Sequence, residues 1–67
     1  MSPGWWRGQV LRKAREKRGL TQVELAEKVG VTRVTISYLE SGKRQPSMDL
    51  LHRLAKALRV KVGELLK

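Results

Sequence analysis

The sequence contains no cysteine and a single histidine, His52. A disulfide framework and a cysteine-based zinc site are therefore excluded, and the histidine clusters that usually bind metals are missing. We expect no metal site and no cofactor. Phenylalanine is absent as well, so the hydrophobic core must rely on leucine, valine, isoleucine and alanine, with one tryptophan at most.

Long hydrophobic runs are also lacking. No stretch approaches the roughly 20 apolar residues that span a bilayer, and the adjacent Trp5 and Trp6 are too short a run for the apolar part of a signal peptide. The chain offers neither a Ser-His-Asp nor a Cys-His arrangement, and it has no glycine-rich phosphate loop. We therefore predict a soluble, cytoplasmic protein that has no membrane partner and is not an enzyme.

Acidic residues are scarce. Six aspartates and glutamates stand against 15 lysines and arginines, which gives a formal charge of +9 on 67 residues. Such a charge favours a polyanionic partner, and nucleic acid is the commonest one for a small domain. Charge alone also fits an anionic membrane surface or simple solubility. The length predicts a single domain over residues 1–67, with residues 1–5 as a flexible lead-in.

Apolar residues recur with helical spacing, and no useful stretch alternates with a period of two. The predicted fold class is all-α, a compact bundle of four to five short helices. These helices are expected at about residues 6–18, 22–29, 33–40 and 48–58, with a short last one within 60–66. Leu51, Leu54 and Leu58 give the fourth helix a core-facing stripe, and Ser47 is placed to cap its start.

Residues 21–40 carry the most specific pattern in the chain. Thr21 and Glu24 form a capping box that starts a helix at residue 22, and Thr32 can cap the helix that follows. Gly30 stands where the first of these helices has to end in a left-handed conformation. The pattern therefore predicts two short helices joined by a tight turn.

Small and apolar residues complete this pattern. Ala26 allows the two helices to approach closely, and Val31 can cover the turn between them. Ile36 and Leu39 recur three residues apart, so both face the first helix. The constellation is a helix-turn-helix signature.

The outward face of the second helix in this pair carries side chains suited to DNA. Four residues point away from its buried face: Arg33, Val34, Thr35 and Tyr38. An arginine can pair with two acceptors of one guanine, whereas a valine can only contact a thymine methyl group. We predict that residues 33–40 form a recognition helix in the major groove of double-stranded DNA.

Most of the chain resembles the helix-turn-helix domain of the Cro and phage-repressor type, also called the XRE family. The matching stretches are residues 11–15 (LRKAR), 19–22 (GLTQ), 25–31 (LAEKVGV), 36–46 (ISYLESGKRQP) and 54–58 (LAKAL). The resemblance implies a lambda-repressor-like DNA-binding domain of five helices. It also implies a sequence-specific transcriptional regulator that binds pseudo-palindromic operators as a homodimer and lies on the nucleoid when bound.

The same resemblance implies roles for individual residues. The base-reading positions are Arg33, Val34, Thr35 and Tyr38, and the phosphate contacts are Gln22, Thr32, Ser37, Lys43 and Arg44. A structural salt bridge is implied between Arg15 and Glu40. The expected dimer contacts are Val60, Val62, Leu65 and Leu66, although these apolar residues would equally suit closure of the core.

Two residues depart from the family pattern. Arg59 stands where glycine or another residue able to adopt a positive φ is usual, so a different exit from the fourth helix is expected. Lys61 replaces the usual cap of the last helix, which weakens the prediction of that helix. The two tryptophans are adjacent, and we expect one of them to pack into the core.

One alternative function stays open at this point. An antitoxin-type module, which binds a small protein partner and also binds DNA, often uses the same domain. The chain contains no long acidic or apolar segment for such a partner. DNA binding is therefore the leading hypothesis.

Overall fold

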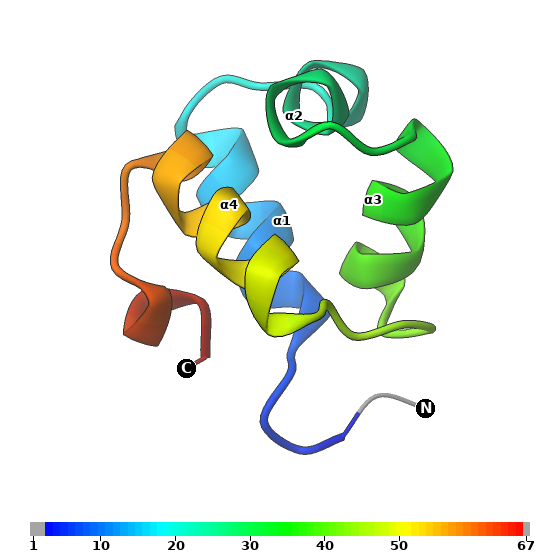
Figure 1. Cartoon of the computed structure of the whole chain (residues 1–67), viewed down its shortest axis with the longest axis vertical. Coiled ribbons are helices and arrows are strands. Elements are labelled where there is room, and N and C mark those ends of the chain that lie inside the picture. Colours follow the sequence, from blue (N-terminus) through cyan, green and yellow to red (C-terminus); the bar gives the residue numbers. More distant parts are fainter. Residues whose placement is uncertain (1–2, 67) are drawn as a thin grey trace.

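The computed structural model describes residues 3–66, which form a bundle of helices (Figure 1). The elements are α1 (Gly8–Lys17), α2 (Gln22–Val29), α3 (Arg33–Ser41), α4 (Met48–Leu58) and a 3-10 helix, η1 (Val62–Leu66). The all-α fold class is confirmed, and α2 and α4 have the predicted bounds. Residues 1, 2 and 67, which belong to the predicted domain and lead-in, lie outside the described residues.

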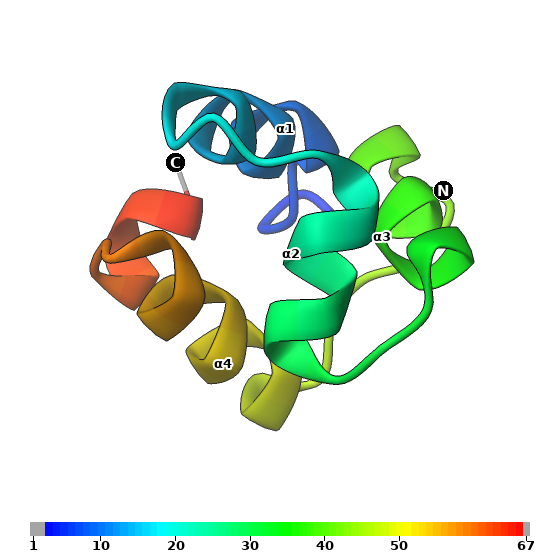
Figure 2. The same cartoon turned by 90° about the horizontal axis from the view of Figure 1, so that it is seen from above.

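The helices enclose one cluster of buried apolar residues. Figure 2 shows α2 between α3 and α4, and α2 packs against both, while α1 packs against α3 and η1. The predicted stripe on α4 faces inward, since Leu51, Leu54 and Leu58 are fully buried. Within residues 3–66, no helix has the length and apolar character needed to cross a membrane.

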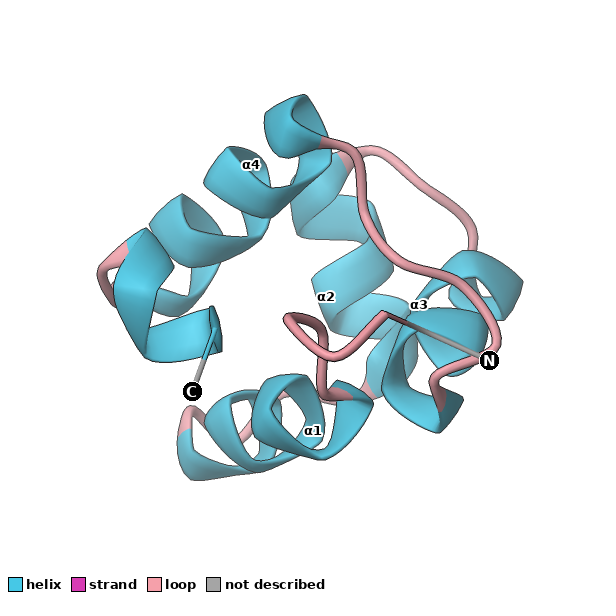
Figure 3. Ribbon diagram, turned by 90° about the horizontal axis from the view of Figure 1, so that it is seen from below, coloured by secondary structure: helices cyan, strands magenta, loops and turns pink. Residues whose placement is uncertain are grey.

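The ends of the helices follow the predicted caps, and the connections between them are turns and loops (Figure 3). Thr21 Oγ1 accepts the Glu24 N–H at 3.0 Å, and Glu24 Oε1 accepts the Thr21 N–H at 2.8 Å. This capping box lowers the pKa of Glu24, chiefly through the backbone hydrogen bond from Thr21. Gly30 ends α2 at φ 76°, and Gly42 ends α3 at φ 80°, both in the left-handed region.

The start of α1 differs from the prediction, because the helix begins at Gly8 and Trp6 precedes it. The Trp6 indole N–H donates to the carbonyl oxygen of Leu39 at 2.9 Å, and the side chain is only 1% exposed. This bond to the end of α3 holds Trp6 in the core and outside the helix. Trp5 is 42% exposed and meets Trp6 edge to face. The prediction that one tryptophan joins the core is confirmed.

The exit from α4 is made by an arginine in a conformation that glycine adopts more easily. Arg59 has φ 58° and ψ 42°, the left-handed region, so the helix ends as it would at a glycine. A side chain in this region costs roughly 1–2 kcal/mol. The expectation of a different exit from the fourth helix was therefore wrong, because Arg59 adopts the glycine-like conformation and accepts its strain. Beyond it the last element is a short 3-10 helix, begun by a bond from the Lys61 N–H to Glu64 Oε2 at 3.0 Å.

The first turn of α1 touches the backbone of α3 directly at Gly8. A Cβ atom on Gly8 would lie 2.1 Å from the carbonyl oxygen of Glu40 and 2.4 Å from that of Leu39. Real atoms do not approach so closely, so this contact requires glycine. The sequence pattern gave no sign of it, because the partner backbone lies more than 30 residues away in the chain.

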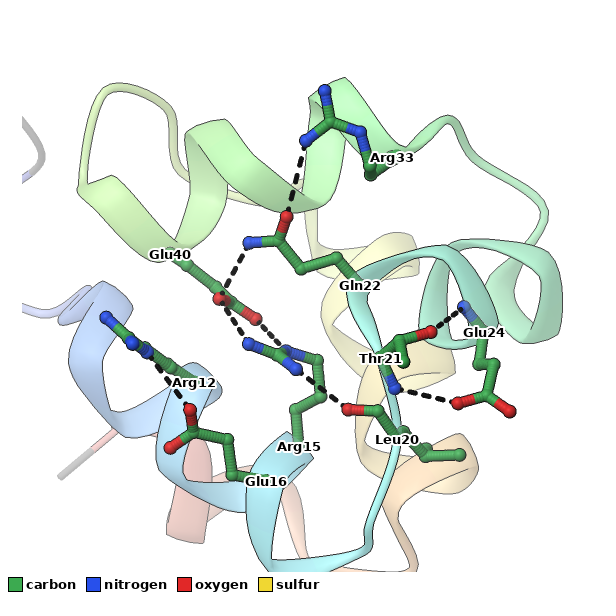
Figure 4. A network of polar contacts seen from close by, with 9 residues as sticks. All are labelled: Arg12, Arg15, Glu16, Leu20, Thr21, Gln22, Glu24, Arg33 and Glu40. Carbon is green, nitrogen blue, oxygen red and sulfur yellow. Dashed lines mark hydrogen bonds and ion pairs between the residues drawn. The ribbon is translucent and has the colours of Figure 1, made fainter.

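The predicted salt bridge between Arg15 and Glu40 is present and joins α1 to the end of α3 (Figure 4). Arg15 Nε donates to Glu40 Oε2 at 2.6 Å, and Nη2 donates to Oε1 at 3.1 Å. The side chains are only 11% and 5% exposed. The hydrogen bond to Glu40 raises the pKa of Arg15 above its usual value. Arg15 Nη1 also donates to the carbonyl oxygen of Leu20, just before α2.

Replacement of Gly8 by alanine is expected to destabilise the fold. The new methyl group must push α1 away from the backbone of α3, at a cost of about 1–3 kcal/mol. Urea unfolding of Gly8→Ala measures this loss. Gly63→Ala is the matched control, because a Cβ on Gly63 meets nothing within 4 Å. Equal stability of the two variants would contradict the close contact.

Replacement of Glu40 by glutamine should lower the free energy of unfolding by about 3 kcal/mol, because it leaves the Arg15 guanidinium nearly buried without its counter-charge. The exposed pair of Arg12 and Glu16 provides the control, since its side chains are 57% and 53% exposed. Glu16→Gln should cost under about 1 kcal/mol. Thermal or urea unfolding compares the two variants, and similar losses would refute the structural role of Glu40.

Candidate nucleic-acid interface

α3 presents one face to the core and the opposite face to solvent. Ile36 and Leu39 are 0% and 1% exposed, as predicted from their spacing. On the other face Arg33 is exposed, and Val34 and Tyr38 are 48% and 40% exposed. Val34 and Tyr38 lie one helical turn apart. The outer face of α3 is therefore accessible to a large ligand such as a DNA duplex.

Thr35, the fourth predicted base-reading residue, is half-buried and tied to the helix cap. Thr32 Oγ1 accepts the Thr35 N–H at 3.2 Å, and the two hydroxyl oxygens lie 3.1 Å apart. These contacts confirm Thr32 as the N-cap of α3. They also use part of the hydrogen-bonding capacity of both hydroxyls, each of which has one donor and two acceptor sites.

The first residues of α2 and α3 are joined through Gln22 (Figure 4). Gln22 Nε2 donates to Glu40 Oε1 at 3.1 Å, and Gln22 Oε1 accepts from Arg33 Nη1 at 3.4 Å. The orientation of the Gln22 amide is thus fixed by a carboxylate on one side and a guanidinium on the other. Sequence reasoning placed Gln22 at a phosphate but missed both partners, because they lie on another helix.

The starts of α2 and α3 also offer backbone donors. The first turn of an α-helix has N–H groups without partners inside the helix, and the helix dipole adds positive potential there. Thr21 takes up the N–H of Glu24, and Thr32 takes up that of Thr35. The N–H groups of the residues before them, at the very start of each helix, suit an anion such as a phosphate.

The far end of α3 adds a basic loop, which Figure 3 shows crossing from α3 to α4. Lys43 and Arg44 are exposed in it. Lys43 Nζ lies 5.5 Å from the centre of the Tyr38 ring, within the range of a cation–π contact. The Arg44 N–H donates to the carbonyl oxygen of Tyr38 at 3.2 Å. These contacts bring two predicted phosphate residues next to a predicted base-reading residue.

Ser37 lies in a polar hollow where α1, α2 and α3 meet. The side chains around it belong to Gln9, Arg12, Arg15, Gln22, Ser37, Glu40 and Ser41. The hollow therefore unites Gln22 and Ser37, two predicted phosphate contacts. Arg12 also borders it, although no specific role was predicted for Arg12.

Of the two roles that the sequence left open for the apolar residues near the C-terminus, the structure shows closure of the core, and buried Leu65 is not available as the expected dimer contact. Leu65 is 1% exposed and completes the core, and Val60 and Val62 are half-buried against it. Leu66 is 39% exposed. Leu66 and the outer parts of the two valines thus remain accessible to a second copy of the chain.

Known proteins are similar to this chain in sequence and in fold. An uncharacterized HTH-type transcriptional regulator of Methanothermobacter thermautotrophicus is 57% identical over 49 residues, or 73% of this chain and 71% of the relative. The P22 c2 repressor in complex with a synthetic operator has a TM-score of 0.87 at 35% identity, covering 92% of this chain and 94% of that one. SinR of Bacillus subtilis in complex with DNA has a TM-score of 0.84 at 34% identity, covering 90% and 97%.

The family comparison agrees with these likenesses. The model of the helix-turn-helix family matches residues 11–65, which include every helix of the bundle except the first turn of α1 and the last residue of η1. The match therefore extends beyond the helix pair to the surrounding helices. The chain belongs to the helix-turn-helix family, of the Cro and phage-repressor (XRE) type.

Proposed function

We propose that this protein is a transcriptional regulator that binds double-stranded DNA with α3 in the major groove. The observation that carries this proposal is the open outer face of α3, flanked by the start of α2 and by a basic loop. A duplex offers base edges to the outer face of α3, and it offers phosphates to the start of α2 and to the basic loop. The likeness to operator-bound P22 c2 repressor supports the same docking.

Within this interface, base reading is assigned to three exposed residues of α3 and to half-buried Thr35. Arg33 donates to the two acceptors of a guanine, O6 and N7. This contact favours guanine over the wrong base by about 1–3 kcal/mol of binding free energy. Gln22 accepts from Arg33 and so limits the directions in which the guanidinium can point. Val34 and the ring of Tyr38 offer apolar area for a thymine methyl group, and Thr35 adds a hydroxyl and a methyl group.

Phosphate contacts surround this centre. The starts of α2 and α3 bind phosphate through backbone N–H groups, supported by the second N–H of the Gln22 amide and by Thr32. Ser37 acts from the polar hollow, and Lys43 and Arg44 act from the loop after α3. These contacts hold the domain in register without reading the sequence.

Two copies of the chain bind one operator in this proposal. The accessible apolar residues near the C-terminus, with Leu66 the most exposed, form the contact between the copies. The two recognition helices then reach half-sites about 34–36 Å apart, one turn of the duplex. The protein acts in the cytoplasm, on the nucleoid.

Selection from a pool of random duplexes tests the function. The protein should enrich one pseudo-palindromic motif whose half-sites are separated by one helical turn of about 10–10.5 base pairs. Sequencing of the retained DNA gives the motif and the spacing. Equal retention of all sequences would reject sequence-specific reading, and enrichment of a single half-site would reject the dimer.

Alanine variants of Arg33 and Lys43 should separate reading from positioning. Arg33→Ala is expected to relax the preference at one base pair of each half-site and to cost about 1–3 kcal/mol on the selected sequence alone. Lys43→Ala should weaken all sequences alike and reduce the slope of log affinity against log salt by about 0.9 per lost phosphate contact. Binding titrations on matched and mismatched duplexes measure both effects. If the two variants behave identically, these role assignments are wrong.

A further inference from the structure

A second basic region lies where the ends of α1, α2 and α4 converge. Two adjoining hollows share Lys28, Ala57 and Arg59, and together they form what we call the basic hollow. Its full lining is Arg18, Leu20, Lys28, Arg53, Lys56, Ala57 and Arg59. All five cationic residues in it are exposed. The sequence predicted no binding role for any of these cations, and only Arg59 stood out, as a departure from the family pattern.

Most of this charge is not held in ion pairs within residues 3–66, although Glu24 interacts electrostatically with Lys28. Arg53 forms an ion pair with Asp49 at 2.8 Å and donates to the carbonyl oxygen of Val29 at 2.9 Å, so it is occupied within the fold. None of the ion pairs seen among residues 3–66 involves the other four cations of the basic hollow. Helix C-termini favour nearby cations, but each carries only about half a unit of negative charge. The basic hollow therefore keeps an excess of positive charge.

This region faces away from the recognition helix. In Figures 1 and 2, α3 lies on the right, whereas the C-terminal ends of α1 and α4 lie on the left. A duplex held by the outer face of α3 therefore leaves the basic hollow uncovered.

The backbone conformation of Arg59 is an independent indication that the basic hollow is a binding site. It is the one non-glycine residue with positive φ among residues 3–66, and a glycine would take the same conformation without strain. Strained backbone that persists without a local benefit is a pointer to function. Here the arginine side chain contributes to the basic hollow, which a glycine would not do.

We propose that the basic hollow is the docking site of an acidic peptide segment of a partner protein. Carboxylates complement its excess positive charge, and the apolar side chains of Leu20 and Ala57 suit an apolar residue placed between them. A duplex presents phosphates and sugars there but no apolar side chain, so a protein segment fits better than a second duplex. DNA and the partner then bind at the same time, on opposite sides of the domain.

The test uses the full chain and a short fluorescein-labelled peptide in which glutamates alternate with leucines. The same peptide with glutamines in place of glutamates is the reference for charge. Fluorescence anisotropy should show binding of the acidic peptide, both to the free protein and to protein saturated with a random-sequence duplex. The double variant Lys28→Glu/Lys56→Glu should bind the peptide about tenfold or more weakly, because rim charges there become repulsive.

Two further variants make the result specific. Arg7→Glu/Lys13→Glu has the same change of charge at exposed positions outside the basic hollow and should keep more of the peptide affinity than the hollow variant does. Arg59→Gly should bind the peptide less tightly although its Tm rises, by about 4–8 °C for a domain of this size. Loss of binding in a more stable protein cannot be attributed to unfolding.

Four outcomes would overturn the proposal. The first is that the glutamine peptide binds as tightly as the acidic one. The second is that the control double variant loses as much peptide affinity as the Lys28→Glu/Lys56→Glu variant. The third is that the duplex displaces the peptide, which would place both on the face of α3. The fourth is that the Lys28→Glu/Lys56→Glu variant loses affinity for the duplex but binds the peptide as before, which would make the basic hollow a second DNA-binding surface.

Discussion

The carboxylate of Glu40 holds the recognition helix in place. It lies in the last turn of α3 and accepts hydrogen bonds from Arg15 on α1 and from Gln22, the first residue of α2. Arg15 in turn binds the carbonyl oxygen of Leu20, so the chain leading into α2 is fixed by the same group. A helix that reads base edges needs a fixed angle to the elements that grip the phosphates. One nearly buried carboxylate provides that link between three helices.

Two groups of exposed cations lie on different sides of the domain. On one side, Arg33, Lys43 and Arg44 surround the outer face of α3, where a duplex carries its phosphates. On the other, a second set of cations lies around Ala57, near the C-terminal ends of α1, α2 and α4. Arg59 belongs to this second set and has a positive φ, a backbone conformation that is strained for a residue with a side chain. This exchange of stability for a charged side chain is the kind of cost that binding sites often carry.

The sequence predicted the local structure around the candidate site well at the level of single helices. The caps at Thr21 and Thr32 and the turn at Gly30 are local, because each depends on atoms a few residues apart. The exposure of Arg33 and Tyr38 follows from the buried face of the same helix. The pair of Arg15 and Glu40 came from resemblance alone, since spacing could not reveal two charges 25 residues apart in the chain.

The amino-acid order by itself determined where helices start and stop and which of their faces is apolar, because capping bonds and helical periodicity act within a few residues. Only the tertiary structure decided what the helices bring to one another. Three contacts join segments that are far apart in the chain. Gly8 packs against the backbone of α3, the Trp6 indole N–H donates to the carbonyl oxygen of Leu39, and the Gln22 amide donates to Glu40. Such contacts depend on the packing angle between helices, which no short stretch of sequence encodes.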